Sequence, residues 1–379
     1  MIAPDKFKGS LTAIEATEAI ERGIERAVPN ARCRRCPMAD GGEGTVAVFL
    51  AHGAAPETVP VRGPRGGRVE ATYARRGDTA IIEVAAASGL QLLDARERDP
   101  TNTDTYGTGQ LIEAALDRGA RHLIAGIGGS ATNDAGTGML RALGVRFFAA
   151  NGEELGDGIL SYDRLQRIDT GALDARLRSA RIEVAVDVDN PLTGPNGAAR
   201  TFAAQKGATG DQIEQLDGVL QRIAEVSAQT LGRDYASEPG AGAAGGLGFA
   251  FVAFLGAQLK PGVRLIARET GLDTMLADAT LCMTGEGKID LQTLHGKTVA
   301  GVADLARERH IPVIAFGGIV EDDAARELAK RGVECVAIAP TGTSRDDAMR
   351  GAARFLEGAA AAAIKRALVV KPGGSGEES

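Results

Sequence analysis

A glycine-rich stretch, GIGGSATNDAGTGM at residues 126–139, has the residue types of an anion-binding loop. It follows an apolar segment that predicts a strand, and its glycines let backbone N–H groups approach an anion without interference from a Cβ atom. Hydroxyl and amide groups can donate to phosphate oxygens, and a carboxylate such as Asp134 can hold Mg²⁺ directly or through water. The polar set at Ser130, Thr132 and Asn133 favours phosphate binding over a mobile turn, although this loop alone does not decide it.

The same stretch also fits a loose dinucleotide-binding pattern, G-x-G-x-x-A, at Gly126, Gly128 and Ala131. A Rossmann fold needs an acidic residue about 20 residues later, at the end of a second strand. Glu153 and Glu154 lie instead in a polar segment that predicts a turn. Binding of NAD is therefore disfavoured.

A pair of carboxylates, Asp187 and Asp189, follows the apolar part of IEVAVDVDNPLTGPNGA. Residues two apart in a strand point to the same face, so these charges would repel each other unless they hold a cation or share a proton. The dipeptide Asn190-Pro191 then predicts a turn, which leaves both acids at the rim of the sheet, where α/β proteins bind ligands. A functional pair is favoured over a solvated strand end.

Two motifs that precede predicted helices carry further charges. PMADGGEGT places Asp40 and Glu43 around two glycines, although acidic residues at a helix N-terminus also complement the helix dipole. APDKFKGS places Lys6, Lys8 and Ser10 before a helix, where lysines have the wrong sign for the dipole. These lysines fit a carboxylate or phosphate ligand and, equally well, a solvated surface.

A motif that follows a predicted strand, TGEGKIDLQTLHGKT, contains Glu286 and ends in an imitation of a P-loop. A P-loop requires glycine five residues before Gly296, and Leu291 stands there, so the motif is not a P-loop. Lys206, within QKGA, is a further candidate cation. Glycine-rich loops, carboxylates that suit Mg²⁺, and lysines are the parts that phosphoryl transfer needs.

The composition argues against several classes of protein. A length of 379 residues predicts about two domains, and a net charge of −7 with 4% aromatic residues argues against nucleic-acid binding. No segment reaches the roughly 20 apolar residues that span a bilayer, and MIAPDKFKGS lacks the apolar stretch of a signal peptide. We therefore expect a cytoplasmic protein without membrane association and with reduced cysteines. The C-x-x-C at Cys33 and Cys36 is a weak metal or redox signal, because no second pair matches it.

Short apolar segments alternate with helical ones, which predicts an α/β protein with buried parallel strands. The clearest helices are expected at residues 12–28, where Thr12 and Glu15 fit a capping box, and near residues 109–118. The predicted strand segments are residues 80–84, 122–127, 182–188, 280–284, 311–316 and 333–338.

The predicted organisation is two α/β domains, of which one is discontinuous. Residues 1–4 look like the end of a strand, and the last three strand–helix units form the natural sheet for it to join. We expect residues 1–60 and 275–370 to form this domain and residues 61–274 to be a second, inserted domain. The polar residues 371–379 are expected to be a disordered tail.

In order along the chain, the motifs resemble those of the bacterial type I glycerate kinases, the glycerate 2-kinase family. The segments that carry the resemblance are APDKFKGSLTA, PMADGGEGT, EVAAASGL, TDTYGTGQLI, GIGGSATNDAGTGM, DVDNPLTGPNGAA, QKGA, GAGAAGGLG and TGEGKIDLQT. Together they cover nearly the whole chain and are highly specific. One departure is Lys6, which stands where the family more often has serine, so that Lys8 is the safer candidate.

The resemblance implies ATP-dependent phosphorylation of D-glycerate with Mg²⁺, in glycolate, glyoxylate or sugar-acid catabolism. The implied product is 2-phosphoglycerate, and 3-phosphoglycerate stays open. The resemblance also implies two α/β domains, one of them flavodoxin-like, with the site in the cleft between them. A dinucleotide-dependent oxidoreductase and a non-catalytic carboxylate-binding module are the alternative functions, and either a monomer or a homodimer is expected.

On this hypothesis each candidate residue receives a role. Asp187 is expected to be the general base, with Asp189 and Asp134 as Mg²⁺ ligands, and the roles of Asp187 and Asp189 could be exchanged. Lys8, with help from Ser10 and Ser88, would bind the glycerate carboxylate. Asp40 and Glu43 would accept hydrogen bonds from substrate hydroxyls. The expected nucleotide contacts are Gly128, Gly129, Ser130, Thr132, Asn133 and Glu286.

Overall fold

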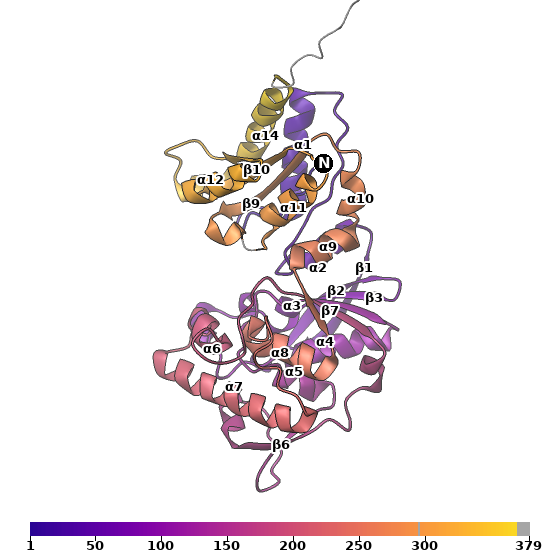
Figure 1. The fold of residues 1–379 in the computed structure, drawn as a ribbon, viewed down its shortest axis with the longest axis vertical. Helices are drawn as coiled ribbons and strands as arrows, with labels where there is room; N and C mark the ends of the chain where they lie inside the picture. Colours follow the sequence, from indigo (N-terminus) through magenta and orange to yellow (C-terminus); the bar gives the residue numbers. More distant parts are fainter. Residues whose placement is uncertain (295, 370–379) are drawn as a thin grey trace, which may run out of the picture. The chain divides into compact units, whose positions relative to one another are not determined.

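The computed structural model describes residues 1–294 and 296–369, and it confirms the predicted α/β class (Figure 1). The chain divides into two compact units. Unit 1 contains Met1–Asp40 and the chain from Val263 onward, and unit 2 contains Gly41–Gly262. The predicted tail, residues 371–379, lies outside the described residues.

These boundaries differ from the predicted ones near residues 60 and 275. Residues 55–62 belong to unit 2 because strand β1 (Ala55–Arg62) pairs antiparallel with β2 (Arg68–Arg76) along its whole length. Helix α9 (Gly262–Thr270) continues into unit 1, where Thr270 Oγ1 accepts a 3.6 Å hydrogen bond from Cys36 Sγ. Strand pairing sets the first limit and the packing of α9 sets the second, and composition reveals neither.

Unit 1 is built on a parallel three-stranded sheet in the order β11–β10–β9. Ile2 forms a parallel bridge with Met283 of β9, so both ends of the chain contribute to this unit. Its elements are α1 (Ala13–Ala27), α9, α10 (Leu272–Leu276), β9 (Cys282–Ile289), α11 (Thr298–Arg307), β10 (Val313–Val320), α12 (Asp322–Lys330), β11 (Val333–Ala337), α13 (Arg345–Arg350) and α14 (Ala352–Val369).

Helices α1 and α14 lie side by side in unit 1 (Figure 1). Helix α1 begins with the predicted capping box, in which the Thr12 side chain accepts from Glu15 N and Glu15 accepts from Thr12 N. The two helices approach closely at Gly23, where a Cβ atom would lie 2.3 Å from Glu357 O. Their apolar residues pack with Met283 and Phe316 of the strands to form the core of this unit.

Unit 2 is built on a six-stranded sheet in the order β1–β2–β3–β4–β7–β8. Strands β1, β2 and β3 pair antiparallel, whereas β3, β4, β7 and β8 pair parallel. The elements are α2 (Thr45–Ala51), β1, β2, β3 (Thr79–Glu83), α3 (Val84–Ser88), α4 (Tyr106–Asp117), β4 (His122–Gly126), α5 (Thr137–Ala142), β5 (Arg146–Ala149), β6 (Leu165–Asp169), β7 (Arg181–Ala185), α6 (Ala198–Phe202), α7 (Gly210–Leu231), α8 (Ala243–Leu255) and β8 (Gln258–Lys260).

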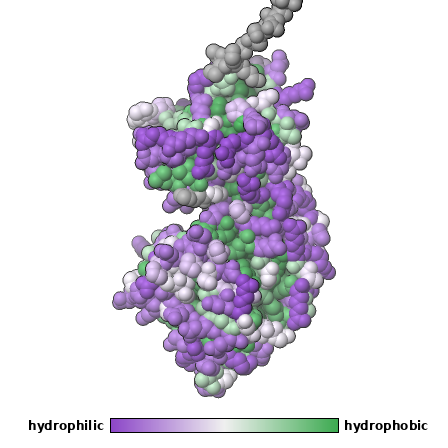
Figure 2. All heavy atoms as spheres, viewed as in Figure 1, coloured by the Kyte–Doolittle hydropathy of each residue, from purple (hydrophilic) through white to green (hydrophobic). Residues whose placement is uncertain are grey.

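On the face shown in Figure 2, both units are mostly hydrophilic, with smaller hydrophobic areas. None of the helices in the described part of the chain combines the length and the apolar content needed to cross a bilayer.

A left-handed segment at the start of α8 packs against the glycine-rich loop of unit 2. Ala244, Gly245 and Gly246 all have positive φ, between 54° and 90°. A Cβ atom on Gly245 would lie 2.1 Å from Thr132 O, and one on Gly246 would lie 2.8 Å from Ala135 Cα. Glycine is required here both for the backbone conformation and for the close approach.

The substitution Gly245→Ala tests this close approach. It should lower the free energy of unfolding by about 2–4 kcal/mol, because a left-handed alanine costs about 1–2 kcal/mol and the overlap with the Thr132 carbonyl adds a similar amount. Urea denaturation measures the loss. The matched control is Gly256→Ala, since Gly256 has φ +63° and nothing lies within 4 Å of the added Cβ. Its free energy of unfolding should fall only by the cost of a left-handed alanine. Equal losses in the two variants would contradict the packing argument.

Candidate active site

Three segments of unit 2 leave the same edge of its sheet. Strands β3, β4 and β7 are adjacent and parallel, so the segments that follow Glu83, Gly126 and Ala185 begin side by side. These segments are EVAAASGL, GIGGSATNDAGTGM and the loop that contains Asp187 and Asp189. The carboxyl edge of a parallel sheet is the usual ligand-binding edge of α/β proteins.

A fourth segment, GGEG at residues 41–44, packs onto this edge through main-chain contacts. Gly128 N donates a 3.3 Å hydrogen bond to Gly41 O. A Cβ atom on Gly126 would lie 2.4 Å from Gly41 O, and one on Gly41 would lie 2.3 Å from Ala185 Cβ. Glycines at these positions therefore allow the 41–44 segment to lie directly against the ends of β4 and β7.

The start of α8 links the glycine-rich loop to the loop that follows β7. Gly242 N donates to Asn190 O at 2.8 Å, and Ala135 N donates to Gly245 O at 3.0 Å. The GIGGSATNDAGTGM and DVDNPL segments thus contact one short stretch, residues 242–245. These polar segments belong to one region of unit 2.

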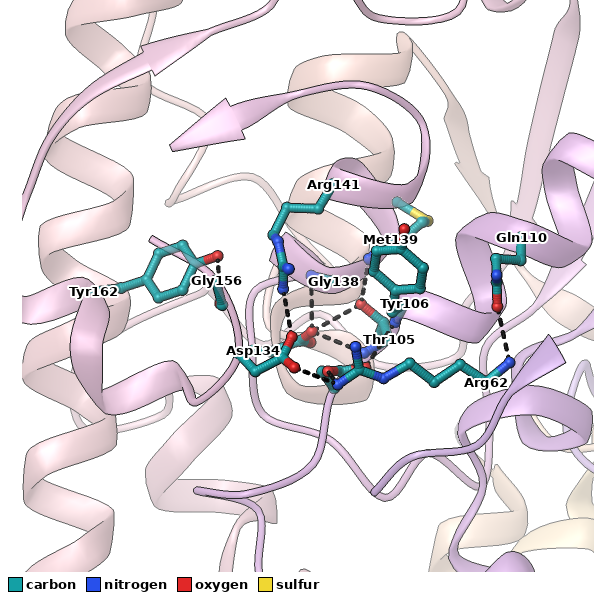
Figure 3. Close-up of polar contacts among 12 residues, drawn as sticks. Arg62, Thr105, Tyr106, Gln110, Asp134, Gly138, Met139, Arg141, Gly156 and Tyr162 are labelled. Carbon is teal, nitrogen blue, oxygen red and sulfur yellow. Dashed lines mark hydrogen bonds and ion pairs between the residues drawn. The ribbon is translucent and has the colours of Figure 1, made fainter. Parts of the chain in front are cut away.

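Asp134 lies inside the loop rather than at its surface, with 1% of its area exposed. Its Oδ2 accepts hydrogen bonds from Thr105 N and Oγ1 and from Gly138 N (Figure 3). Its Oδ1 accepts a hydrogen bond from Gly136 N. Burial raises the pKa of this carboxyl, and the hydrogen bonds oppose that shift. These contacts favour a structural role in fixing the loop against α4 and α5, and they leave the carboxylate poorly placed for the expected Mg²⁺ contact.

A cluster of ion pairs beside Asp134 was not predicted from the sequence (Figure 3). Arg62 lies 2.9 Å from both Asp104 and Asp157, and Arg141 also pairs with Asp157. Burial raises the pKa of Asp104 to about 6, and the charge of Asp134 adds to the shift. Both guanidinium groups lie over the ring of Tyr106. No local sequence pattern signals this cluster, because Arg62, Arg141 and Asp157 are far apart along the chain.

Lys206 is the buried cation of the glycine-rich loop. Its Nζ donates to Ser130 Oγ at 2.8 Å and to Thr132 O at 2.6 Å, and the residue is 3% exposed. Burial lowers the pKa of Lys206 to about 7, and the charge of Asp134 opposes this shift. Three buried polar atoms in the loop have no hydrogen-bond partner among the described residues: Thr132 Oγ1, Asn133 Nδ2 and Asn133 Oδ1.

The other candidates in unit 2 have mixed surroundings. Asp187 is half-buried, and its Oδ1 accepts a 2.9 Å hydrogen bond from Gly262 N, whereas Asp189 and Glu43 are exposed. Ser88 is fully buried, and its hydroxyl pairs with Thr108 Oγ1 at 2.9 Å. This contact holds the Ser88 hydroxyl in the protein interior, which weakens the expectation that it binds glycerate. Across residues 1–294 and 296–369, no group of three or more His, Cys, Asp and Glu side chains is arranged as a metal site.

In unit 1, the first polar turn contains Lys8 and Ser10. Lys8 is exposed, and Ser10 Oγ donates to Phe7 O at 3.0 Å. The turn lies against the end of β9, since a Cβ atom on Gly287 would lie 2.8 Å from Lys8 N. The Lys8 side chain is therefore available to a ligand on the surface of this unit.

Three carboxylates of unit 1, Asp5, Asp40 and Glu286, influence one another. Burial raises the pKa of Asp5 to about 6 and that of Glu286 to about 7, and the charge of Asp40 adds to both shifts. Asp5 accepts a 2.6 Å hydrogen bond from Thr298 Oγ1, and Glu286 accepts one from Thr293 Oγ1. Asp5 was missed by sequence reasoning, although it stands in the APDK motif that follows the isolated bridges of Ile2.

Comparison with known proteins agrees with this arrangement of motifs. A family model described as the glycerate kinase family matches residues 1–368. A glycerate kinase of Bacillus subtilis (strain 168) is 47% identical over 97% of this chain and 98% of its own. The glycerate 2-kinase of Escherichia coli (strain K12) is also 47% identical, over 93% of each chain.

A solved structure extends the agreement to the fold. The crystal structure of a candidate glycerate kinase 2 from Salmonella typhimurium LT2 has 44% sequence identity and a TM-score of 0.85, over 97% of this chain and 98% of that one. The relatives thus align along nearly the whole chain, and the solved structure has the same fold. The chain belongs to the glycerate kinase family.

Proposed function

We propose that this protein catalyses ATP-dependent phosphorylation of D-glycerate and that the product is 2-phosphoglycerate. The relatives named above support glycerate as the substrate. One structural observation supports the chemistry most strongly: in unit 2, a glycine-rich loop with a buried lysine and unpartnered donor groups meets the same short segment as the loop that contains Asp187 and Asp189. An anion cradle beside carboxylates is what phosphoryl transfer requires. 3-Phosphoglycerate remains the alternative product.

The residues present fit the phosphates of ATP. Gly129 has φ +75°, and Gly128 lies so close to Gly42 that a Cβ atom would approach within 2.8 Å. Backbone N–H groups of a glycine-rich loop can bind a phosphate, and Ser130, Thr132 and Asn133 supply hydroxyl and amide groups. Burial raises the pKa of Glu286 in unit 1 to about 7, so its carboxyl group can carry a proton near neutral pH. It could then donate a hydrogen bond to the nucleotide as well as accept one from it.

The acidic pair supplies a base and a ligand for Mg²⁺. Mg²⁺ is typically held by one or two carboxylates together with substrate phosphates, and the exposed Asp189 fits that donor set. When bound, Mg²⁺ neutralises charge on the transferred phosphoryl group. Asp187, whose position is fixed by Gly262 N, is proposed to accept the proton of the reacting glycerate hydroxyl. The two aspartates could exchange these roles, and the buried Asp134 is left out of the metal site.

The proposed glycerate contacts come from the two motifs nearest the N-terminus, APDKFKGS and PMADGGEGT. The exposed Lys8 suits the substrate carboxylate, with Ser10 beside it, and Asp40 and Glu43 can accept hydrogen bonds from the hydroxyls. No observation supports a dinucleotide as cofactor or a purely binding role, so neither alternative is retained.

The first test is ADP release in the presence of D-glycerate, with phosphorus NMR of the product. We expect turnover that depends on both substrates and a phosphomonoester on the 2-hydroxyl. The variant Asp187→Asn should fold and lose about 10²–10⁴-fold in kcat, which is the usual contribution of a general base. Asp163→Asn, an exposed aspartate of the same unit, is the control. Near-normal turnover by folded Asp187→Asn would refute the base assignment.

Lys8→Ala tests the carboxylate contact. Loss of a charge-assisted hydrogen bond should raise the KM for glycerate by about 10–100-fold and leave the KM for ATP nearly unchanged. Steady-state kinetics with each substrate varied in turn measures the split. Lys330→Ala, which removes an exposed lysine of unit 1, should change neither KM. A larger effect on ATP would assign Lys8 to the nucleotide instead.

Glu286 should make stability depend on pH. Because its folded pKa of about 7 lies above the ordinary glutamate pKa of 4.5, its contribution is fully present below pH 4.5 and is lost as pH rises through about 7. The loss is at most about 3 kcal/mol. Glu286→Gln should flatten the decline of the urea midpoint in this window, whereas the surface variant Glu25→Gln should keep it. An unchanged pH profile in Glu286→Gln would count against the raised pKa.

A further inference from the structure

We propose that Lys206 is a positioning residue for nucleotide binding: from beneath the glycine-rich loop it orients the Ser130 hydroxyl toward a phosphate of the nucleotide, and phosphate binding keeps it protonated. This inference rests on the proposed kinase function and names a residue to which that function assigned no role. Lys206 acts through Ser130 and the loop rather than by touching the reacting atoms.

The geometry fixes the direction of the hydrogen bonds. A protonated lysine has donors and no acceptor, so Ser130 Oγ must accept from Lys206 Nζ, 2.8 Å away. The Ser130 O–H is then free to donate to another group. Lys206 also donates to Thr132 O at 2.6 Å, so a single cation holds the loop at two points. Both contacts join the turn at residues 204–206 to the loop that follows β4.

A second observation points to a ligand at the same loop. Thr132 and Asn133 are fully buried, yet the Thr132 hydroxyl and both polar atoms of the Asn133 amide have no partner in the part of the chain that the structure describes. Buried polar groups in folded proteins are nearly always hydrogen-bonded, since an unmade bond is costly. Phosphate oxygens would accept from the hydroxyl and from the amide N–H₂. Because these atoms are covered, binding requires a local shift of the loop.

The electrostatics of Lys206 depend on one nearby charge. Asp134 favours the protonated form, but four hydrogen bonds already satisfy its carboxylate. On the other side, the main chain of Arg98 packs against Gly207, where a Cβ atom would lie 2.2 Å from Arg98 O. Burial dominates and lowers the pKa of Lys206 to about 7. An anion placed beside the loop raises that pKa, so binding should draw a proton from solution near neutral pH.

Calorimetric titration of the full-length protein with ADP, without glycerate, tests this coupling. Titrations at pH 7 in two buffers of different ionisation enthalpy give the number of protons taken up. Wild type should take up about half a proton more than Lys206→Met, because a group with a pKa of about 7 is half protonated before binding. Loss of the charge should also weaken ADP binding by about 10–100-fold. At pH 5 the extra proton uptake should vanish.

The control is Lys260→Met, which removes a lysine of the same unit that pairs with Glu183 at 2.6 Å. It should retain wild-type ADP affinity and proton uptake. If Lys206→Met does not fold, Ser130→Ala takes its place: it should weaken ADP binding by about 3–10-fold and keep the proton uptake. Unchanged ADP affinity in a folded Lys206→Met or Ser130→Ala protein overturns the inference, as does an effect on glycerate binding alone.

The ADP titration, read together with the ADP-release assay on D-glycerate, separates this inference from the proposed function. Lys206-dependent ADP binding without phosphorylation of glycerate would refute the function and leave the inference standing. Normal phosphorylation of glycerate, together with equal ADP affinity in wild type and Lys206→Met, would support the function and refute the inference.

Discussion

The candidate site depends on main-chain approaches that only glycine permits. Gly41, Gly126 and Gly245 each bring one segment so close to another that a Cβ atom would lie within 2.4 Å of its neighbour. Through these contacts the 41–44 segment, the loop that follows β4 and the start of α8 form one layer at the carboxyl edge of the parallel strands. The glycines therefore determine which polar groups meet, in addition to making backbone N–H groups accessible.

Burial then sets the chemistry of the groups that this packing encloses. In a medium of low polarity an ion is stable only when hydrogen bonds or an opposite charge compensate for lost hydration. Asp134 meets that condition with four donors, whereas Lys206 has two acceptors, and its pKa falls toward neutrality. The Asp134 carboxylate thus stabilises the conformation of the loop. The pKa of Lys206 lies where a nearby anion can change its protonation.

The sequence predicted what local patterns encode and missed what distant contacts create. Apolar runs located β3, β4 and β7, and the Thr12–Glu15 spacing located the start of α1. The grouping of the polar motifs followed from strand ends in a parallel sheet. Composition offered no sign that Thr105 would supply two of the four donors around Asp134, because that contact depends on how α4 packs. The unit boundaries were missed for the same reason, since pairing of β1 with β2 sets one of them.

The nucleotide phosphates are proposed to bind at the carboxyl edge of β3, β4 and β7. Hydrogen–deuterium exchange measured with and without ADP tests it most directly, because the amides of the proposed cradle report on their own protection. We expect ADP binding to slow the exchange of the backbone amides of residues 127–136, with a smaller effect in residues 41–44. Saturating ADP that leaves exchange in residues 127–136 unchanged, while it protects other segments, would contradict the account.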